Sequence, residues 1–472
     1  MRNSVTFYLN GVKKEVRGKN VFLPLSSYLR YEAHLTGTKV VCAEGDCGAC
    51  TIMAAKWRPG SESNYQSINS CIAMTFAMDG ARLVTVEGMA EKDQPCEVQE
   101  SMIRNFGGQC GFCTPGFVMA ITSLHEEKAK PTLQNAKNYL TGNLCRCTGY
   151  LPILQAAMDV DVNKHVTLKT KYPTVDAGGL TQLMSEPVLI TTDGYEYYAP
   201  TTLEEAYRYK SLHLDVILFS GATDLGVQIN KGHLIAKRIL SLHLIKDLYQ
   251  QQILGSEVVV GARVTLSELQ KLIAKEIPTL DNFLNIFASL QIKNAATLVG
   301  NVANASPIAD TTPVLMVLDA ELDIFGKNGK TTRPLKDFYI GYKKINLQKD
   351  EFITHVRFQI PEQQDKIENY KVSQRRDLDI STVNASFNFK MDGNKIKTAK
   401  IAFGGVAATT IRLCDIERKI EGVEINAQSV KNIKKLILDS IKPLSDMRGS
   451  AEYRTLLAGN LFEKFVKEQL IL

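Results

Sequence analysis

The most constraining feature of this sequence is a set of eight cysteines between residues 42 and 147, arranged as two quartets. The first quartet has the spacing C-x4-C-x2-C-x20-C and comprises Cys42, Cys47, Cys50 and Cys71. The second has the spacing C-x2-C-x31-C-x-C and comprises Cys110, Cys113, Cys145 and Cys147. Four thiolates are the ligand set of a [2Fe–2S] cluster, and C-x4-C-x2-C with a distant fourth cysteine is the plant-type ferredoxin spacing. Two such clusters in one chain indicate an electron path.

Structural zinc is the alternative occupant of both quartets. Zinc sites favour paired C-x2–4-C knuckles, whereas three cysteines of the first quartet share one short loop from Cys42 to Cys50. This loop also contains Gly45 and Gly48, which allow backbone N–H groups to point at the sulfurs and stabilise an anionic cluster. We therefore predict iron–sulfur binding, and a zinc-binding scaffold without enzymatic activity stays open as the alternative.

Length and composition limit the class of protein. A chain of 472 residues, 44% hydrophobic and 22% charged, is expected to form about three globular domains. Its 56 basic and 50 acidic residues are dispersed, which argues against nucleic-acid binding. The sequence shows no signal-peptide pattern and no apolar run of membrane-spanning length. We therefore expect a cytoplasmic protein. In that reducing compartment disulfides are rare, so clustered cysteines more often bind metal.

Residues 1–85 are predicted to form a plant-type, ferredoxin-like β-grasp domain. Alternating apolar residues on both sides of Asn10-Gly11 predict a β-hairpin, because this dipeptide supplies the positive φ angles of a tight turn. One helix is expected before the cysteine loop, and another over Ile72–Met78, directly after Cys71.

Residues 86–165 are predicted to be helical and to hold the second quartet. Helices are expected over Glu97–Phe106, from Thr114-Pro115, after the capping Thr132, and near Pro152–Val160. One cysteine pair then lies in the loop after the first helix, and the other lies in the loop before the fourth. Two helical hairpins, each with a cysteine pair at one end, could share one cluster in a four-helix bundle.

Three motifs around these cysteines resemble the iron–sulfur part of the molybdenum hydroxylases, a family that includes xanthine dehydrogenase and aldehyde oxidase. They are Glu44–Thr51 (EGDCGACT), Gly108–Gly116 (GQCGFCTPG) and Gly142–Tyr150 (GNLCRCTGY). The resemblance implies that the second quartet lies nearer a molybdenum cofactor and the first nearer a flavin. It also implies that Gln109 contacts the pterin. The alternative for Gln109 is a polar loop residue bonded to the backbone.

Residues 166–195 are predicted to be a linker whose apolar residues, such as Val175 and Leu180, lie against a protein surface. Residues 196–360 then contain two loops rich in small residues, Phe219–Gly226 and the stretch 294–310. Since the chain contains no G-x-G, a Rossmann fingerprint is excluded. Two such loops could hold the pyrophosphate of a dinucleotide through backbone N–H groups, but either loop alone is better explained as an ordinary tight turn.

The same resemblance assigns both loops to FAD, in a flavin domain of the vanillyl-alcohol-oxidase type. The residues that it assigns to FAD are Phe219, Ser220, Gly221, Ala222, Thr223, Asp224, Leu225, Gly226, Phe287, Thr297, Gly300, Asn301, Ser306, Asp310 and Lys371. In this assignment the loops hold the pyrophosphate, Asp310 supports ribityl or ribose hydroxyls, and Phe287 packs beside the isoalloxazine ring. The alternatives are core packing for Phe287 and a solvated surface position for Lys371.

Residues 361–472 resemble the C-terminal flavoprotein domain of the same family. The predicted fold class is therefore α+β and multidomain, with a β-grasp domain, a helical cluster-binding domain and two α+β flavin domains. One departure from the family pattern is Leu378-Asp379, where animal xanthine dehydrogenases carry two adjacent acids. This departure leaves the preference for NAD over oxygen open.

A function follows from the resemblance. The large molybdopterin domain of the fused animal enzymes does not follow in this sequence, so we expect a small subunit that pairs with a separate molybdopterin-binding large subunit, as a dimer of heterodimers. Substrate would be hydroxylated on that partner, and electrons would pass through both clusters to FAD and then to NAD. Xanthine is the expected substrate, and aldehydes or another N-heterocycle are the alternatives. No catalytic residue beyond the cofactor-binding ones is expected on this chain.

Overall fold

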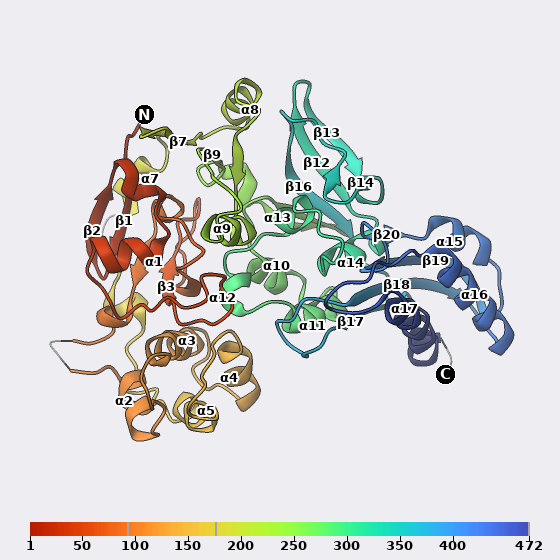
Figure 1. Cartoon of the computed structure of the whole chain (residues 1–472), viewed down its shortest axis with the longest axis horizontal. Coiled ribbons are helices and arrows are strands. Elements are labelled where there is room, and N and C mark those ends of the chain that lie inside the picture. The colour runs from red at the N-terminus through yellow and green to blue at the C-terminus, as the bar shows by residue number, and fades with distance from the viewer. Residues whose placement is uncertain (92–93, 175–176, 471–472) are drawn as a thin grey trace. The chain divides into compact units, whose positions relative to one another are not determined.

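The computed structural model describes residues 1–91, 94–174 and 177–470 and divides the chain into two compact units (Figure 1). Unit 1 comprises Met1–Tyr249 together with Ser289–Ala296, and unit 2 comprises Gln250–Ala288 together with Thr297–Leu472. Val175 lies outside the described residues. The boundaries of the four predicted domains and of the linker stay predictions.

Unit 1 begins with a five-stranded sheet of ferredoxin-like order, β2-β1-β5-β3-β4. Its strands are β1 (Val5–Leu9), β2 (Val12–Val16), β3 (Thr51–Ala55), β4 (Gln66–Asn69) and β5 (Arg82–Val84). The predicted hairpin is confirmed, because β1 and β2 pair antiparallel around Asn10 and Gly11, which have φ angles of 49° and 82°. Strands β1 and β5 pair in parallel, so the chain crosses over between them.

The helices of this first region differ from the prediction. The helix before the cysteine loop is short, α1 (Leu25–Ser27) followed by a wider turn over Tyr28–Glu32, and it ends before His34, which has a φ of 56°. The helix predicted over Ile72–Met78 is wrong, because only Thr75–Met78 forms a helical turn. Residues 72 and 73 instead lie in a turn and a bend, and this part of the chain bonds to residues near α1. Leu25 N donates to Ala73 O at 2.7 Å, and Thr75 N donates to Leu23 O at 3.0 Å.

The second region of unit 1 is helical, as predicted. Its four helices are α2 (Glu97–Arg104), α3 (Thr114–Glu127), α4 (Leu133–Leu140) and α5 (Leu151–Met158). Thr132 caps α4 by accepting a hydrogen bond from Asn135 N, and Pro115 lies in the first turn of α3. Helix α3 is buried along most of its length and packs against α2, α4 and β3. Both cysteine-bearing loops of the second quartet therefore lie at ends of helices that share one core.

The predicted linker contains more helix and strand than expected. It contains α6 (Leu168–Lys171), α7 (Ala177–Leu183) and β6 (Val188–Thr192). Strand β6 pairs with β7 (Tyr195–Ala199) in a four-stranded sheet of order β6-β7-β9-β8, completed by β9 (Arg238–Ser241) and β8 (Ile217–Phe219). Leu180 and Leu183 pack against the core of unit 1, as expected of linker residues that lie against the surface of a neighbouring domain. Helices α8 (Leu203–Leu212), α9 (Thr223–Asn230) and α12 (Leu290–Lys293) complete unit 1.

Unit 2 is built on two main antiparallel sheets, β10-β11-β16-β12-β13 and β17-β18-β19-β20. Its strands are β10 (Gln251–Leu254), β11 (Glu257–Gly261), β12 (Glu321–Gly326), β13 (Gly329–Pro334), β14 (Tyr339–Gly341), β15 (Lys344–Ile345), β16 (Phe352–Gln359), β17 (Lys366–Val372), β18 (Val383–Asp392), β19 (Lys395–Gly404) and β20 (Ile411–Arg412). Its helices are α10 (Leu266–Ile273), α11 (Pro278–Ile286), α13 (Leu298–Ala303), α14 (Thr311–Val317), α15 (Cys414–Ile420), α16 (Ala427–Ser440) and α17 (Ala451–Phe465).

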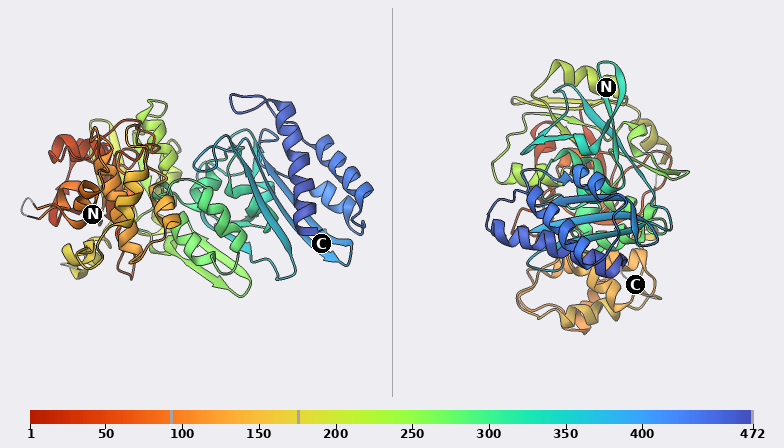
Figure 2. Two further views of the ribbon diagram at one scale, coloured as in Figure 1. Left: turned by 90° about the horizontal axis from the view of Figure 1, so that it is seen from below. Right: turned by 90° about the vertical axis from the view of Figure 1, so that its right-hand side faces the viewer.

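The C-terminal sheet of unit 2 is covered by helices on both faces (Figure 2). Helix α14 contacts β18 and β19, and α15 and α17 contact the same two strands on the side of the apolar core. Phe387 at the centre of β18 stacks on Phe465 of α17, with ring centroids 4.9 Å apart. In the described parts of the chain, no helix combines the length and the hydropathy needed to cross a bilayer.

Candidate redox site

The strand register brings the first quartet together. Strands β3 and β4 pair antiparallel with Thr51 opposite Asn69, so Cys50, just before β3, and Cys71, just after β4, lie side by side. Hydrogen bonds from Cys47 and Cys71 lower the pKa of Cys42, and the hydrogen bond from Cys71 lowers the pKa of Cys50 despite its burial. The four thiols therefore form one connected group, and all ten cysteines of the chain lack disulfide partners.

Polar groups fix the loop that carries the first quartet. The backbone N–H of Glu44 donates to Cys42 Sγ at 3.4 Å, as expected of a loop wrapped around anionic sulfur. Asn69 Nδ2 donates to Gly45 O at 2.7 Å, and Ser70 Oγ donates to Cys50 O at 2.7 Å. These bonds hold the thiols in place from the neighbouring strand rather than from the loop itself.

The four cysteines of the second quartet form two pairs. Each pair has one cysteine from the loop between α2 and α3 and one from the loop between α4 and α5. Burial and a hydrogen bond with Cys145 raise the pKa of Cys113 to about 12. A hydrogen bond with Cys110 likewise raises the pKa of Cys147. Thr148 donates to Cys145 Sγ through its hydroxyl at 3.2 Å and its backbone N–H at 3.4 Å, and these bonds outweigh burial and lower the pKa of Cys145.

These arrangements fit [2Fe–2S] clusters. Each iron of such a cluster takes two thiolates, and the second quartet offers two pairs, Cys113/Cys145 and Cys110/Cys147. Within residues 1–91, 94–174 and 177–470, no three His, Cys, Asp or Glu side chains are arranged to hold a single metal ion. The two cysteine pairs are compatible with a two-iron group, and the identity of the metal stays a prediction.

Gln109, the predicted pterin contact, lies beside Cys110 and is exposed, as Cys110 is. The position agrees with a residue that faces another group, and its role stays a prediction.

The loop predicted to bind FAD in unit 1 is built into the environment of the first quartet. Phe219 is 1% exposed and packs edge-on against Phe76, so its side chain belongs to the core of unit 1. Ala222 has a φ of 56° and precedes α9, the helix that continues the loop. Gly226 of α9 lies so close to the first quartet that a Cβ would fall 2.1 Å from Ile72 O. Its lack of a side chain is thus explained by close packing, whatever it binds.

Helix α9 also bonds to the loops of the first quartet. Asn230 Nδ2 donates to Ala43 O at 2.9 Å and to Cys71 O at 2.8 Å, and Lys231 pairs with Glu44. The predicted flavin loop and the first cysteine group are therefore neighbours in space within unit 1.

In unit 2, two predicted FAD residues form a buried ion pair. Lys371 Nζ lies 2.5 Å from Asp310 Oδ2, with side chains 2% and 6% exposed. Ser381 and Asn384 donate to Asp310 Oδ1 at 2.5 and 2.9 Å. A solvated surface position for Lys371 is therefore excluded. Lys371 Nζ also lies 5.9 Å from the ring of Phe287, which is only partly buried and is not a core residue.

The remaining predicted residues of unit 2 bond to their own loop. Thr297 caps α13 by accepting from Gly300 N at 3.0 Å, and Asn301 Oδ1 accepts from Thr311 Oγ1 at 2.6 Å. Ser306 Oγ accepts from the backbone of residue 308. These bonds give the loop a fixed shape with its small residues, and contact with a ligand stays a prediction for each of them.

Sequence reasoning missed the polar residues that join the loop of the first quartet, residues 42–50, to the loop that carries Cys145 and Cys147, residues 142–147. We call these the first and the second cysteine loop. Asn143 lies inside the third motif and Gln291 lies in α12, and both are buried and hydrogen-bonded to each other. No spacing pattern marks an amide whose partner is distant in sequence, so only the structure reveals these contacts.

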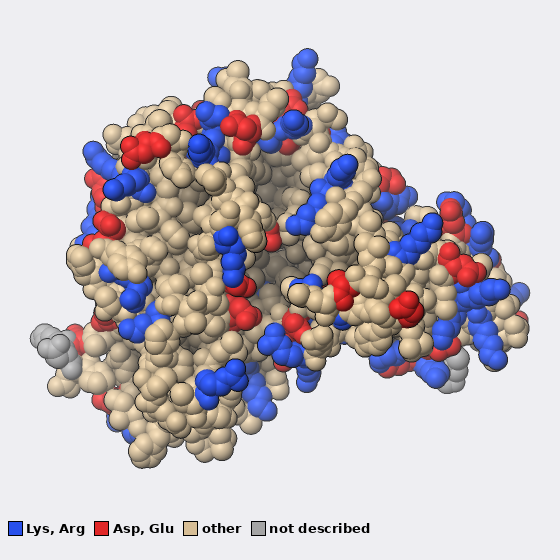
Figure 3. Space-filling view, in the orientation of Figure 1, with Lys and Arg blue, Asp and Glu red and all other residues tan. Residues whose placement is uncertain are grey.

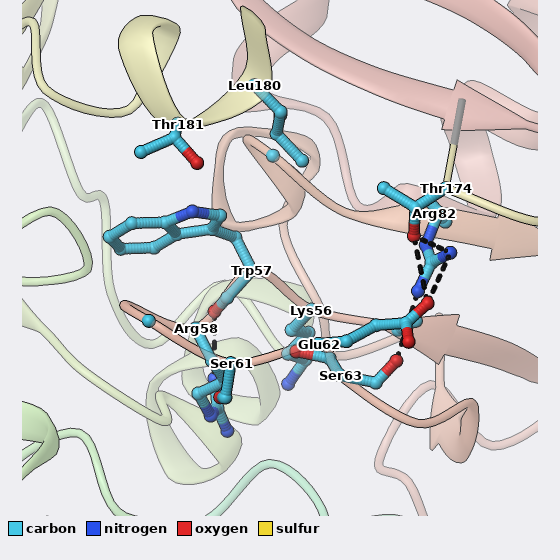
Figure 4. Close-up of a pocket in the computed structure, with 13 residues that line it drawn as sticks. Lys56, Trp57, Arg58, Ser61, Glu62, Ser63, Arg82, Thr174, Leu180 and Thr181 are labelled. Atoms are coloured by element: carbon cyan, nitrogen blue, oxygen red, sulfur yellow. Dashed lines mark hydrogen bonds and ion pairs between the residues drawn. The ribbon is translucent and has the colours of Figure 1, made fainter. Parts of the chain in front are cut away.

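Unit 1 also contains a cavity of about 470 Å³ that none of the predicted site residues lines (Figure 4). The indole of Trp57 forms one wall, and Arg82 lies at the opposite side with Thr174 and Glu62. The guanidinium of Arg82 bonds to Thr174 Oγ1 and Ser63 O, so its charge is already engaged within the chain.

Three family models match consecutive parts of the chain. Residues 85–158 match a [2Fe-2S] binding domain, residues 193–362 match the FAD binding domain in molybdopterin dehydrogenase, and residues 368–469 match the CO dehydrogenase flavoprotein C-terminal domain. The helical second region and the two flavin regions are thus matched in the order expected from the sequence.

Curated relatives match nearly the whole chain. Xanthine dehydrogenase 1 of Arabidopsis thaliana is 29% identical over 97% of this chain and 39% of its own length. Xanthine dehydrogenase of Drosophila subobscura is 30% identical over 86% of this chain and 35% of its own length. The chain thus spans less than two fifths of the length of these relatives.

Solved structures match a little more than half of the chain. Carbon monoxide dehydrogenase from Oligotropha carboxidovorans is 25% identical, with a TM-score of 0.55 over 58% of this chain and 97% of the matched chain. Quinoline 2-oxidoreductase from Pseudomonas putida 86 shares the fold at 23% identity, with a TM-score of 0.54 over 58% of this chain and 96% of the matched chain.

Proposed function

We propose that this chain, which is the iron–sulfur and FAD-binding portion of a molybdenum hydroxylase, passes electrons from a molybdopterin-binding partner subunit to FAD and then to NAD. The observation that carries this proposal is the packing of α9, which connects the predicted flavin loop directly to the first cysteine group. An electron carrier needs such short connections between its redox groups, whereas a zinc scaffold does not.

The chain's own residues would hold the groups as follows. The two cysteine quartets would bind two [2Fe–2S] clusters, and the loops at 219–226 and 297–310, with Phe287 and Lys371, would bind FAD in a domain of the vanillyl-alcohol-oxidase type. When bound, the clusters supply one-electron transfer and the flavin supplies the change to two-electron chemistry with NAD. The buried Lys371–Asp310 pair gives unit 2 a fixed donor set that could orient ligand hydroxyls or phosphate.

The surface around the second quartet supports docking of a partner. Exposed apolar side chains flank the cysteines on both loops, namely Phe112, Leu144, Tyr150 and Leu151, with exposed fractions of 38% to 63%. The face that the helices α2–α5 present in Figure 3 is largely uncharged. Since large apolar residues clustered on a surface usually mark an interface, we propose that the molybdopterin subunit binds here, with Gln109 toward the pterin. The complex would be a cytoplasmic dimer of heterodimers.

Xanthine is the proposed substrate of the complex, because the curated relatives that match almost the entire chain are described as xanthine dehydrogenases. The alternative is a complex that acts on an aldehyde or another substrate. It stays open because a solved structure that matches at 25% identity is a carbon monoxide dehydrogenase rather than a xanthine dehydrogenase.

The experiment is to purify the complex that contains this chain and to add xanthine, an aldehyde or quinoline without oxygen. Bleaching of the cluster and flavin absorbance by xanthine, followed by NADH formation, is the expected result. Bleaching by another substrate alone would replace xanthine by that substrate. A complex that no substrate bleaches, although dithionite does, would contradict the proposed function.

A further inference from the structure

A buried polar network joins the two cysteine loops inside unit 1. Gln291 of α12 is fully buried, and its Nε2 donates to Asn143 Oδ1 at 2.7 Å. Asn143 Nδ2 donates in turn to Gly48 O at 2.9 Å and approaches Thr51 Oγ1 at 3.4 Å. Since a carbonyl oxygen only accepts, the bond to Gly48 fixes the orientation of the Asn143 amide, and that amide fixes the orientation of Gln291.

Next to this network, one backbone hydrogen bond connects the two quartets. Leu144 N donates to Cys47 O at 2.9 Å. Cys47 belongs to the first quartet, and Leu144 is bonded covalently to Cys145 of the second. The shortest bonded route between the quartets therefore contains a single hydrogen bond, and Gln291 and Asn143 lie beside it.

Close packing shows that the spacing of the two loops is tightly set. A Cβ on Gly48 would fall 2.3 Å from Gly142 O, and a Cβ on Gly116 would fall 2.4 Å from Gly48 O. A Cβ on Gly142 would fall 2.3 Å from Gln291 Oε1. The carbonyl Oε1 of Gln291 is itself buried without a hydrogen-bond partner. A buried polar atom without a hydrogen-bond partner lowers the free energy of unfolding. The bond from Gln291 Nε2 to Asn143 offsets this cost in part.

We propose that Gln291 is a positioning residue that locks the two cysteine loops together and thereby sets the electronic coupling between the two groups that they would hold. The inference rests on the proposed function, because it assigns to Gln291 a role in electron passage. The residue acts mainly through Asn143, whose Nδ2 donates to Gly48 O, and its own Nε2 lies 3.5 Å from Thr51 Oγ1, next to Cys50. It comes from the part of the sequence that follows the first flavin loop, so the chain uses its flavin-binding part to fix the geometry of its iron–sulfur part.

The test compares Gln291→Met, which keeps the length of the side chain but loses the amide, with Asn294→Leu as the matched control. Asn294 is another buried amide of the same segment, and its Nδ2 donates to Ser67 O of β4 at 2.9 Å, whereas Gln291 donates to Asn143 of the second cysteine loop. Gln291→Leu serves as a second variant if Gln291→Met does not fold, since it is also apolar and lacks the donor to Asn143 but places less side chain in the site.

Two readouts are measured on the full chain. The first is hydrogen exchange of the Leu144 amide in the metal-free protein, which is expected to become roughly tenfold faster in Gln291→Met and to stay unchanged in Asn294→Leu. The second is the magnetic interaction between the two reduced clusters in the iron-loaded protein, measured by electron paramagnetic resonance, which is expected to weaken only in the Gln291 variants.

The proposal is overturned if the Gln291 variants match the wild type in both readouts, or if Asn294→Leu changes them equally. A wild-type chain that takes up no iron would refute the proposed function, and with it the role in electron passage. The exchange result would still decide whether Gln291 locks the loops.

Discussion

The two cysteine groups share a ligand count but differ in their surroundings. In the first quartet Cys50 and Cys71 are 1% and 2% exposed, and α9 and α12 cover the loop. In the second quartet Cys110 and Cys147 are exposed on loops with apolar neighbours. The first group is thus more buried than the second, which agrees with the proposed direction of electron passage from a partner at the second group toward the predicted flavin loop beside the first.

The largest expected effect separates the two groups by single cysteine changes. Cys147→Ser should remove one cluster and leave the other, so that iron falls from about four to about two per chain. Cys71→Ser should give the same iron loss and also lower the free energy of unfolding, because its sulfur is buried between β4 and the first loop. Metal analysis with electron paramagnetic resonance checks both. Loss of both signals in Cys147→Ser would mean that the quartets are wrongly partitioned.

A second comparison uses two glycines with the same backbone geometry. Gly48 has a φ of 67° and Gly149 a φ of 69°, but a Cβ on Gly48 would collide with Gly142 O, whereas a Cβ on Gly149 would meet nothing within 4 Å. Gly149→Ala should cost about 1–2 kcal/mol of strain. Gly48→Ala should add about 1–3 kcal/mol from the collision. Urea unfolding measures both, and equal costs would refute the tight spacing of the two loops.

The two regions should also respond differently to acid. Burial lowers the pKa of His125 in α3, whose Nε2 lies 2.9 Å from Ala157 O. The folded helical region therefore binds fewer protons than the unfolded chain, and its stability should fall as the pH drops below about 6.5.

Asp79 gives the first region a different pH limit. Burial opposes its ionisation, but hydrogen bonds from His243 and Arg2 lower its pKa below the ordinary carboxyl value. This contribution is present above the ordinary carboxyl range and is lost only in stronger acid. Hydrogen-exchange protection at mildly acidic pH should thus decrease in α3 and α5 before β1. His125→Gln should remove the early loss, and a simultaneous loss in both regions would contradict the difference.

The smallest expected effect concerns Thr148, whose hydroxyl donates to Cys145 Sγ. Such a bond stabilises negative charge on sulfur, so Thr148→Val should lower the reduction potential of the second cluster by about 20–60 mV, which corresponds to about 0.5–1.5 kcal/mol. Thr148→Ser keeps the donor and is the control. Redox titration of both clusters checks the shift, and an equal shift in the first cluster would show that the effect is not local.

Local signals in the sequence predicted local structure well. Asn10-Gly11 specified the first hairpin because few residues accept positive φ, and Thr132 and Pro115 marked helix starts because they satisfy or avoid free N–H groups. The helix predicted after Cys71 was wrong, because the backbone of Ala73 and Thr75 bonds to Leu25 and Leu23 instead of continuing a helix. Tertiary contacts here override local propensity.

Long-range contacts could not be predicted from the sequence. The pairing of β6 with β7 turned part of a predicted linker into sheet, since a strand needs a partner and the sequence does not name it. The resemblance selected Lys371 and Asp310 separately, and only the structure shows that they form an ion pair. Gln291 gave no signal at all, because a buried amide is recognised by its partners.

The most direct test of the account is the metal, sulfide and flavin content of the purified chain, produced with ample iron. The account predicts about four iron, about four sulfide and one FAD per chain, with visible absorbance from both kinds of group. A colourless protein that contains zinc in place of iron would contradict it.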